Sequence, residues 1–285
     1  MILVDMNQVC ISNLMMQIGS RKNDVDEDLV RHMVLNSLRS YRSRFHNEYG
    51  ELVLCYDSKK YWRRDFFPNY KANRKKDREN SGLDWALIFD TLNNIRDEVR
   101  EYFPYKVLEV EGAEADDIIA SIVFHISKTP SEFEKVLVLS GDKDFIQLQK
   151  NNFVKQYAPV QKKFINGIDP NIYIKEHVLK GDRSDGVPNF LSPDNTFTDE
   201  LRQKPLAKKK LEAWVEMNPQ DFCSEEMMRN YQRNTTLIDL EYIPQELQER
   251  IIEEYRKPAK GDRAGLLNYF ITKRLRNLMN DIGDF

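Results

Sequence analysis

The chain has 285 residues, which allows two domains or one large domain with a full hydrophobic core. It carries 43 Lys and Arg against 46 Asp and Glu, so the net charge of −3 excludes overall basicity as evidence for a nucleic-acid partner. Three scattered cysteines and the lack of any apolar run of roughly 18 residues exclude a disulfide framework and a membrane span, so we expect a cytoplasmic protein.

Strands and helices alternate along the first half of the chain. Apolar runs predict buried strands at residues 2–5, 52–56, 106–110 and 135–140. Helical spacing of apolar side chains predicts helices at residues 7–18, 26–46, 84–103 and 113–127. An edge hairpin is expected at residues 152–157 and 162–165. This order predicts an α/β fold, with a mostly parallel central sheet and helices on both faces.

The second half of the chain has no further strand pattern. From Pro170 it has helical character to the end, beginning with a helix at residues 170–180. We therefore place a boundary near residue 165. Beyond it the chain either wraps the sheet or forms a small helical domain.

Acidic side chains follow the predicted strands. They stand at three strand ends and in the first turn of helix 113–127: Asp5, Asp57, Asp142, Asp144, Glu114, Asp116 and Asp117. The helix dipole alone explains an acid in a first helical turn, but it does not explain acids at strand ends. Because the carboxyl ends of parallel strands form one crevice, we expect these carboxylates to converge there.

A converging cluster of carboxylates needs positive charge between its members. No His or Cys accompanies them at ligand spacing, so the expected ion is Mg²⁺ or Mn²⁺ rather than zinc. With Asp185, from a turn described below, the acids are too many for one Mg²⁺, which takes one or two carboxylates. We therefore expect two metal ions.

Residues 59–78 are the most basic part of the chain and also contain interleaved aromatic side chains. A charge run is often only a solvated surface, but aromatics beside cations are typical of single-strand binding. Because the segment follows Asp57, we expect it to lie over the acidic crevice. Its candidate nucleic-acid contacts are Arg63, Arg64, Tyr70, Lys71, Arg74 and Lys75.

A glycine-rich turn, GDRSDGVP at residues 181–188, follows helix 170–180. It is either an ordinary helix cap or a loop that presents backbone amides to a duplex phosphate and carries Asp185 to the metal crevice. The candidate contacts are Gly181, Arg183, Ser184 and Gly186. Lys208, in the basic run KPLAKKK, is a further candidate, with surface solubility as the alternative explanation.

EGAEADDIIA, residues 70–74, SGDKDF and GDRSDGVP together resemble the 5′-nuclease or flap endonuclease family. This family includes the nuclease domains of bacterial DNA polymerase I and phage 5′ to 3′ exonucleases, and the likeness is greatest to the ribonuclease H branch of T-even phages. The resemblance implies a PIN-like nuclease core at residues 1–165 with a helical arch at about 58–82. It also implies a helical duplex-binding domain at 166–285 with a helix-three-turn-helix motif.

The implied activity is Mg²⁺-dependent hydrolysis near the 5′ end of RNA or DNA annealed to a template, or at a 5′ flap, as in primer removal during replication. In the two-metal mechanism, one ion activates a water and the other stabilises the leaving oxygen. All eight acids match metal-site positions, with Asp57, Glu114, Asp117 and Asp142 grouped at one ion, Asp144 and Asp185 at the other, and Asp5 and Asp116 as supporting acids. Lys71 and Arg74 match residues that contact the scissile phosphate, so the expected catalytic set is Lys71, Arg74, Asp117 and Asp142.

The resemblance further implies a monomer that works beside a single-strand binding protein and a sliding clamp. The chain departs from the family after Pro188, where residues 189–203 are an insertion before Lys204 and Pro205 open the next helix. This departure argues against the potassium ion that is common at the duplex-binding turn. Two alternatives stay open: a PIN-type ribonuclease and a non-catalytic, structure-specific DNA-binding protein.

Overall fold

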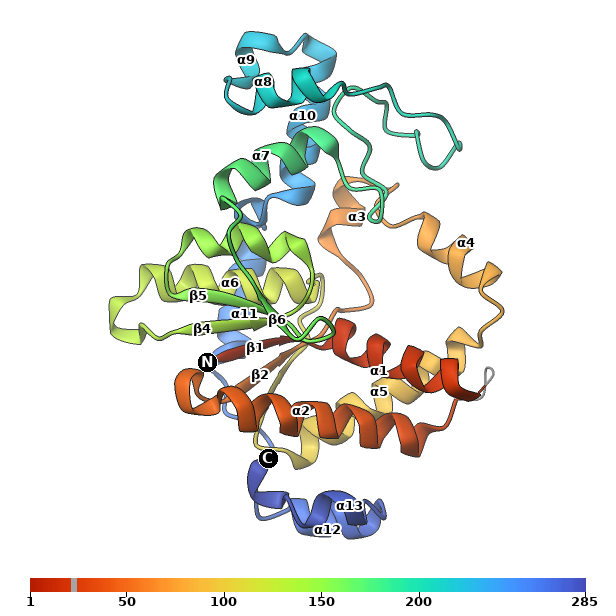
Figure 1. Cartoon of the computed structure of the whole chain (residues 1–285), viewed down its shortest axis with the longest axis vertical. Coiled ribbons are helices and arrows are strands. Elements are labelled where there is room, and N and C mark those ends of the chain that lie inside the picture. The colour runs from red at the N-terminus through yellow and green to blue at the C-terminus, as the bar shows by residue number, and fades with distance from the viewer. Residues whose placement is uncertain (22–24) are drawn as a thin grey trace.

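A six-stranded sheet forms the centre of the part of the chain that the computed structural model describes, residues 1–21 and 25–285 (Figure 1). The strands are β1 Ile2–Asp5, β2 Leu52–Cys55, β3 Lys106–Leu108, β4 Val136–Leu139, β5 Val154–Ala158 and β6 Lys163–Ile165. Their order in the sheet is β3-β2-β1-β4-β5-β6. β1 to β5 are parallel, and β6 pairs antiparallel with β5. The predicted α/β fold and the edge hairpin are confirmed.

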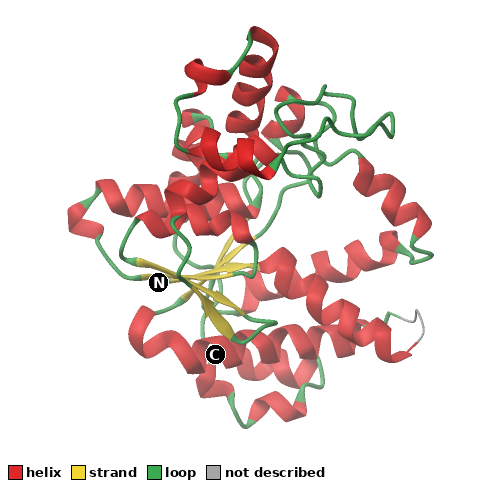
Figure 2. Cartoon of the chain, turned by 45° about the horizontal axis from the view of Figure 1, so that its top comes forward, coloured by secondary structure: helices red, strands yellow, loops and turns green. Residues whose placement is uncertain are grey.

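Helices cover both faces of this sheet (Figure 2). One face carries α1 Met6–Arg21, α2 Glu27–Tyr49 and α5 Trp85–Tyr102, and the other carries α6 Ala115–Lys128 and α11 Gln245–Arg256. Ile2 and Val4 of β1 pack into the first layer and Leu3 into the second. Both faces are therefore buried, which is why the strands are continuous apolar runs rather than alternating ones.

Two short helices lie in the connection between β2 and α5: α3 Trp62–Phe66 and α4 Asn73–Asn80. Residues between them are anchored, since Phe67 and Tyr70 join a small core with Val178 and Val187. α4 buries none of its residues, and Figure 1 shows it spanning from the α3 side of the molecule toward α5. The segment predicted as a basic arch thus has an anchored first half and an exposed second half.

Four helices form a layer above this region: α7 Pro170–Lys180, α8 Lys208–Val215, α9 Pro219–Phe222 and α10 Glu225–Ile238. Leu179, Phe190 and Leu211 pack together inside it. The helix expected to open at Lys204 begins at Lys208 instead. The Lys204 backbone is held by the preceding loop, because its N–H donates to Ser192 Oγ at 2.8 Å.

The C-terminal segment returns to the sheet. It contains α12 Leu266–Thr272 and α13 Arg276–Met279. The described residues also form the 3₁₀ turns η1 Pro130–Glu132, η2 Lys143–Lys150, η3 Leu240–Tyr242 and η4 Ile282–Asp284. Leu266, Phe270 and Phe285 belong to the core beneath α2 and α5. Both arrangements that were left open for the second half occur. Residues 170–238 form the helical layer, and the residues after 240 pack against the sheet.

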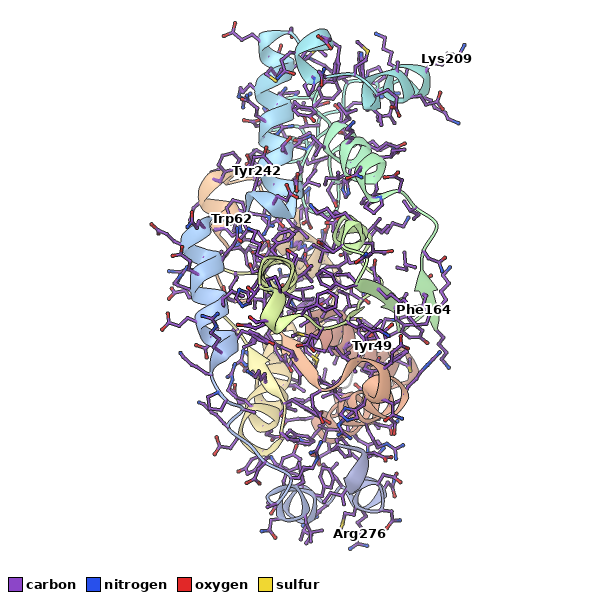
Figure 3. The ribbon with its side chains drawn as sticks, turned by 90° about the vertical axis from the view of Figure 1, so that its left-hand side faces the viewer. Tyr49, Trp62, Phe164, Lys209, Tyr242 and Arg276 are labelled. Atoms are coloured by element: carbon purple, nitrogen blue, oxygen red, sulfur yellow. The ribbon has the colours of Figure 1, made fainter. Side chains whose placement is uncertain are left out.

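The molecule is long in one direction, with Lys209 of α8 at one end and Arg276 of α13 at the other (Figure 3). Among the helices that the structure describes, none combines the length and the apolar character that crossing a membrane requires.

Candidate active site

Carboxylates from several strand ends lie together at one edge of the sheet. Asp5, at the end of β1, accepts a hydrogen bond from Ser140 Oγ just after β4, at 2.9 Å. Asp57, just after β2, accepts one from the backbone N–H of Ala115, the first residue of α6, at 2.7 Å. β1 is thus tied to β4, and β2 to α6. The parallel sheet therefore brings together acids that are far apart in the sequence.

Burial raises the pKa values of these carboxyl groups. The pKa of Asp57 rises to about 7, mainly through burial. The pKa of Asp144 also rises to about 7, through burial and then through the negative charge of Asp142. Burial is likewise the main cause of the raised pKa values of Asp5 and Asp116. A cluster of this kind retains protons unless a cation takes their place.

The start of α6 is fixed by α3. Glu114 and Asp117 form a capping box at this helix start, in which Asp117 Oδ2 accepts the N–H of Glu114 at 2.9 Å. Arg63 Nη1 lies 2.9 Å from Glu114 Oε2 and 2.8 Å from Asp117 Oδ1. Trp62 Nε1 donates to Asp117 at 3.2 Å. Both oxygens of Asp117 are therefore engaged by protein groups, and its side chain is fully buried.

Cationic and hydroxyl groups from the α3–α4 junction reach the acids. Tyr70 Oη lies 3.0 Å from Glu114 and 2.8 Å from Asp185. Lys71 Nζ pairs with Glu114 and lies 3.5 Å from Asp185, and Arg74 lies 2.8 Å from Asp185. Burial acts to raise the pKa of Glu114, but the nearby cations, Lys71 first, outweigh it and hold that pKa below its usual value. Glu114 is therefore charged at neutral pH.

The turn after α7 is a tight hairpin that requires glycine at two positions. Gly181 and Gly186 have φ values of 68° and 74°, which favour glycine. A Cβ on Gly181 would lie 2.4 Å from the Val187 carbonyl oxygen, and one on Gly186 would lie 2.9 Å from the Asn69 carbonyl oxygen. The turn therefore packs directly against the α3–α4 junction.

Asp182 and His177 connect this turn to the acidic cluster. Asp182 Oδ1 accepts the N–H groups of Ser184 at 2.7 Å and Asp185 at 3.2 Å. His177 Nε2 lies 3.3 Å from Asp182, and its Nδ1 lies 3.2 Å from Asp144. Ligand atoms of Asp144, His177 and Asp182 lie within 4.8 Å of one another, close enough to hold a metal ion.

Comparison with known protein families identifies the chain. Residues 3–178 match the 5′-3′ exonuclease N-terminal resolvase-like domain, and residues 168–285 match the T4 RNase H C-terminal domain. The chain belongs to the 5′-3′ exonuclease family. It is accordingly a nuclease, a hydrolytic phosphodiesterase, as the motifs at residues 111–120, 140–145 and 181–188 predicted.

Individual relatives of known sequence or structure are also nucleases of this kind. The chain is 33% identical to the Ribonuclease H of Enterobacteria phage T4 over 99% of this chain and 95% of that protein. It is 31% identical to a 5′-3′ exonuclease of Buchnera aphidicola over 48% of this chain and 47% of that protein. The fold resembles the T5 D15 protein co-crystallized with metal ions, with a TM-score of 0.60, 17% identity, and coverage of 89% of this chain and 97% of that one.

The donor atoms of the site suit a hard divalent cation. The cluster offers carboxylate oxygens whose pKa values are raised, first by burial and then by neighbouring acids. Mg²⁺ and Mn²⁺ bind oxygen ligands, and Mn²⁺ also accepts an imidazole such as that of His177 at the rim. The residues present therefore fit the divalent ions that the family implies.

Four of the predicted nucleic-acid contacts are buried: Arg63, Tyr70, Lys71 and Gly186. Arg63 and Tyr70 are each only 3% exposed, because they bind the acids of α6 and the turn from inside the protein. Among the aromatic side chains of residues 59–78, Phe66 is exposed, Tyr61 and Trp62 are partly exposed, and Phe67 and Tyr70 are buried. Lys71 is buried too, although its ammonium group reaches the acids. The predicted contacts that lie at the surface are Arg64, Lys75, Arg183, Ser184 and Lys208.

Sequence reasoning missed His177, Asp182 and Arg233. A signal existed for Asp182, since Asp two residues before Ser in a glycine turn is typical of a side chain that caps backbone N–H groups. His177 could not be identified, because the rotation of α7 about its axis decides whether that side chain faces the acids. Arg233 is treated below.

Proposed function

We propose that this nuclease hydrolyses phosphodiester bonds near the 5′ end of RNA or DNA annealed to a template, and at 5′ flaps, in a Mg²⁺-dependent reaction. One observation carries the proposal. The acids from β1, β2, β4, α6 and the 181–188 turn share one site, and Lys71 and Arg74 contact Glu114 and Asp185 within it. Carboxylates that could hold metal ions therefore lie next to cations that could bind a phosphate.

We propose that five acids of this cluster would hold two Mg²⁺ ions. We assign Asp57, Glu114 and Asp142 to one ion and Asp144 and Asp185 to the other, with Mn²⁺ able to substitute. When bound, such ions lower the pKa of a water nucleophile and stabilise charge on the phosphate oxygens. Asp5, Asp116 and Asp117 have supporting roles. Asp117 in particular orients Glu114, because it caps the backbone N–H of that residue.

Lys71 and Arg74 have an electrostatic role toward the phosphate. Asp185 lies 2.8 Å from Arg74, and Lys71 is held beneath it, so both cations are oriented before substrate binds. A preorganised cation contributes a few kcal/mol to the stabilisation of charge that develops in the transition state. Because both cations would act on a phosphate and not on a base edge, base identity should matter little.

The 181–188 turn is the proposed duplex contact. Arg183 and Ser184 are exposed at its tip, and Asp182 fixes the N–H groups behind them. Lys208 begins α8 in the same helical layer and adds positive charge at the surface. Phosphate contacts of this kind set the register of a duplex without reading its sequence.

The T4 relative is named a ribonuclease, and a T5 flap endonuclease with a similar fold was crystallised in a complex with DNA. These names support a role in the removal of RNA primers during replication. We further propose that the protein acts as a monomer in the cytoplasm of a phage-infected host. The single-strand binding protein and the sliding clamp stay predictions, since no described surface feature identifies either partner.

A cleavage assay tests the proposed function. The substrate is a 5′-labelled RNA annealed to a longer DNA, incubated with the protein in Mg²⁺ or in EDTA. We expect short 5′ products with Mg²⁺ and none with EDTA, and no products from Asp142→Asn. Asp169→Asn is the matched control, since Asp169 caps α7 at an exposed position. Intact 5′ ends with every divalent ion would refute the proposal, and preferential cleavage of free single-stranded RNA would support the PIN-type alternative.

A further inference from the structure

A buried arginine lies behind the 181–188 turn. Arg233 of α10 is 5% exposed, and its guanidinium group faces the backbone carbonyls of the segment after Pro188. Nη2 donates to the carbonyl oxygens of Pro188 at 3.0 Å and Asn189 at 3.5 Å, and Nη1 donates to that of Ser192 at 3.4 Å. Nη1 also pairs with Asp194 at 2.5 Å.

The neighbouring residue completes this arrangement. Asn234 Nδ2 donates to the carbonyl oxygens of Val178 at 2.8 Å and Pro188 at 2.9 Å. Four backbone carbonyls, one from α7, one from the end of the turn and two from the segment after it, therefore point at the same part of α10. Converging carbonyl oxygens are the ligands of a hard cation. Here, however, each of them already accepts an N–H group.

None of these four carbonyl oxygens is free of an N–H donor, which does not fit the potassium ion that is common at this turn in the family. A guanidinium group carries a permanent positive charge and five N–H donors in one plane, so a single side chain can bind several carbonyls and a carboxylate. Arg233 therefore supplies the positive charge that a bound monovalent ion would otherwise provide. Three of its partners, Asn189, Ser192 and Asp194, lie in the 189–203 insertion, so the departure from the family pattern supplies most of the groups that Arg233 binds.

The same segment contacts the α3–α4 junction, residues 67–72, which forms the base of the predicted arch. Asn69 Nδ2 donates to the carbonyl oxygen of Asp194 at 2.9 Å, and the Lys71 N–H donates to that of Asp185 at 2.7 Å. Asp194 thus binds Arg233 through its side chain and the arch base through its backbone. A shift of Arg233 would move the turn and the arch base relative to each other.

We propose that Arg233 is a positioning residue that replaces a bound monovalent cation and fixes the 181–188 turn against the arch base. The inference rests on the proposed function, in which this turn binds a duplex. It assigns to this chain a duplex-binding site that needs no potassium.

The experiment measures the affinity for a recessed duplex in EDTA at constant ionic strength, in K⁺, Na⁺ or tetramethylammonium salts. We expect the wild-type Kd to agree within about twofold in all three salts, and Arg233→Ala to bind about tenfold more weakly or worse. Millimolar guanidinium should restore much of the lost affinity to Arg233→Ala, a rescue that a merely structural loss would not show. Arg229→Ala is the matched control, because Arg229 lies on the same helix and pairs with the same Asp194 but is 58% exposed.

Arg233→Lys covers the case in which the alanine variant does not fold. It keeps the charge but loses the planar donors, so we expect intermediate affinity and no preference for potassium. Two results each overturn the inference: wild-type affinity that falls more than about fivefold without K⁺, and full affinity in both Arg233 variants. If the wild type binds no duplex in any salt, the proposed function fails as well. If it binds and cleaves while the variants are unaffected, only the inference fails.

Discussion

Replacement of one acid in the cluster should stabilise the metal-free protein. Burial raises the pKa of Asp57 from 3.8 to about 7. Between these values the folded protein holds a proton that the unfolded chain has lost. Asp57 therefore lowers the free energy of unfolding as pH rises from about 4 to 7, and the whole loss is present above pH 7. Asp57→Asn removes this loss and keeps an oxygen that accepts the Ala115 N–H.

The size of the effect follows from the pKa shift. A difference of about three pH units corresponds to about 4 kcal/mol, and coupling to the other acids reduces the value for one site to about 2 to 4 kcal/mol. For a chain of this size, one kcal/mol moves Tm by roughly 2 to 4 °C. Without metal at pH 8, Asp57→Asn should therefore melt roughly 5 to 15 °C above the wild type.

The assay is thermal unfolding in EDTA at pH 5 and pH 8, repeated at pH 8 with 10 mM Mg²⁺, a concentration of roughly 100 times a submillimolar Kd. At pH 5 the folded wild type is protonated at Asp57 but the unfolded chain is largely ionised, so only part of the loss is present and the difference in Tm between the two proteins should be smaller than at pH 8. At pH 8 in EDTA the variant should be the more stable, and Mg²⁺ should raise the Tm of the wild type by several degrees and that of the variant by less.

Asp169→Asn is the control for the substitution itself, since Asp169 also accepts backbone N–H groups but lies outside the cluster. The Tm of Asp169→Asn should change with pH and with Mg²⁺ as that of the wild type does. Equal melting temperatures of the wild type and Asp57→Asn at pH 8 in EDTA would refute the reasoning, because burial would then not disfavour the Asp57 carboxylate.

Lys71→Ala should reduce the single-turnover rate of cleavage about 100-fold or more. The control Lys75→Ala removes a cation that is 87% exposed and should change this rate by less than about threefold. Equal rates for the two variants would remove Lys71 from the mechanism. Asp117→Asn should lower the free energy of unfolding by about 2 to 4 kcal/mol in urea titrations, because it breaks the capping box and the buried ion pair. Asp142→Asn should leave stability within about 0.5 kcal/mol and abolish cleavage, and the opposite pattern would exchange the roles of these two acids. His177→Gln should raise the Mg²⁺ concentration for half-maximal rate about tenfold, because Asp144 loses a group that orients it; an unchanged requirement would exclude that role.

The sheet could be predicted because its signals are local. Each parallel strand is an apolar run buried on both faces, and the acid after it marks the carboxyl end that faces the crevice. The pairing of Ile2 with Leu52 on one side and Leu137 on the other then follows from placing β1 in the middle of the sheet. The positions of Asp5 and Asp57 followed from these signals alone.

The α3–α4 junction could not be predicted, because its signals are not local. α3 has only five residues, too few for a hydrophobic period that would show which face is buried, so Arg63 looked like its exposed neighbour Arg64. Lys71 has a φ of 54°, a left-handed conformation that nothing in its residue type announces. Arg233 lies in a polar run, and its partners belong to an insertion without periodicity.

Asp185 explains why these hidden contacts matter for the reaction. Its side chain binds Tyr70 and Arg74, its carbonyl accepts the Lys71 N–H, and its own N–H is held by Asp182 in the turn. Asp185, which we assign to a metal ion, therefore belongs to the proposed duplex-binding turn and also contacts the α3–α4 junction. A duplex that moves the turn must also move Asp185 and the cations bound to it. Under the proposed function, we expect substrate position and metal affinity to be coupled through Asp185, and a nucleic acid bound in the wrong register to leave the acids and cations misaligned.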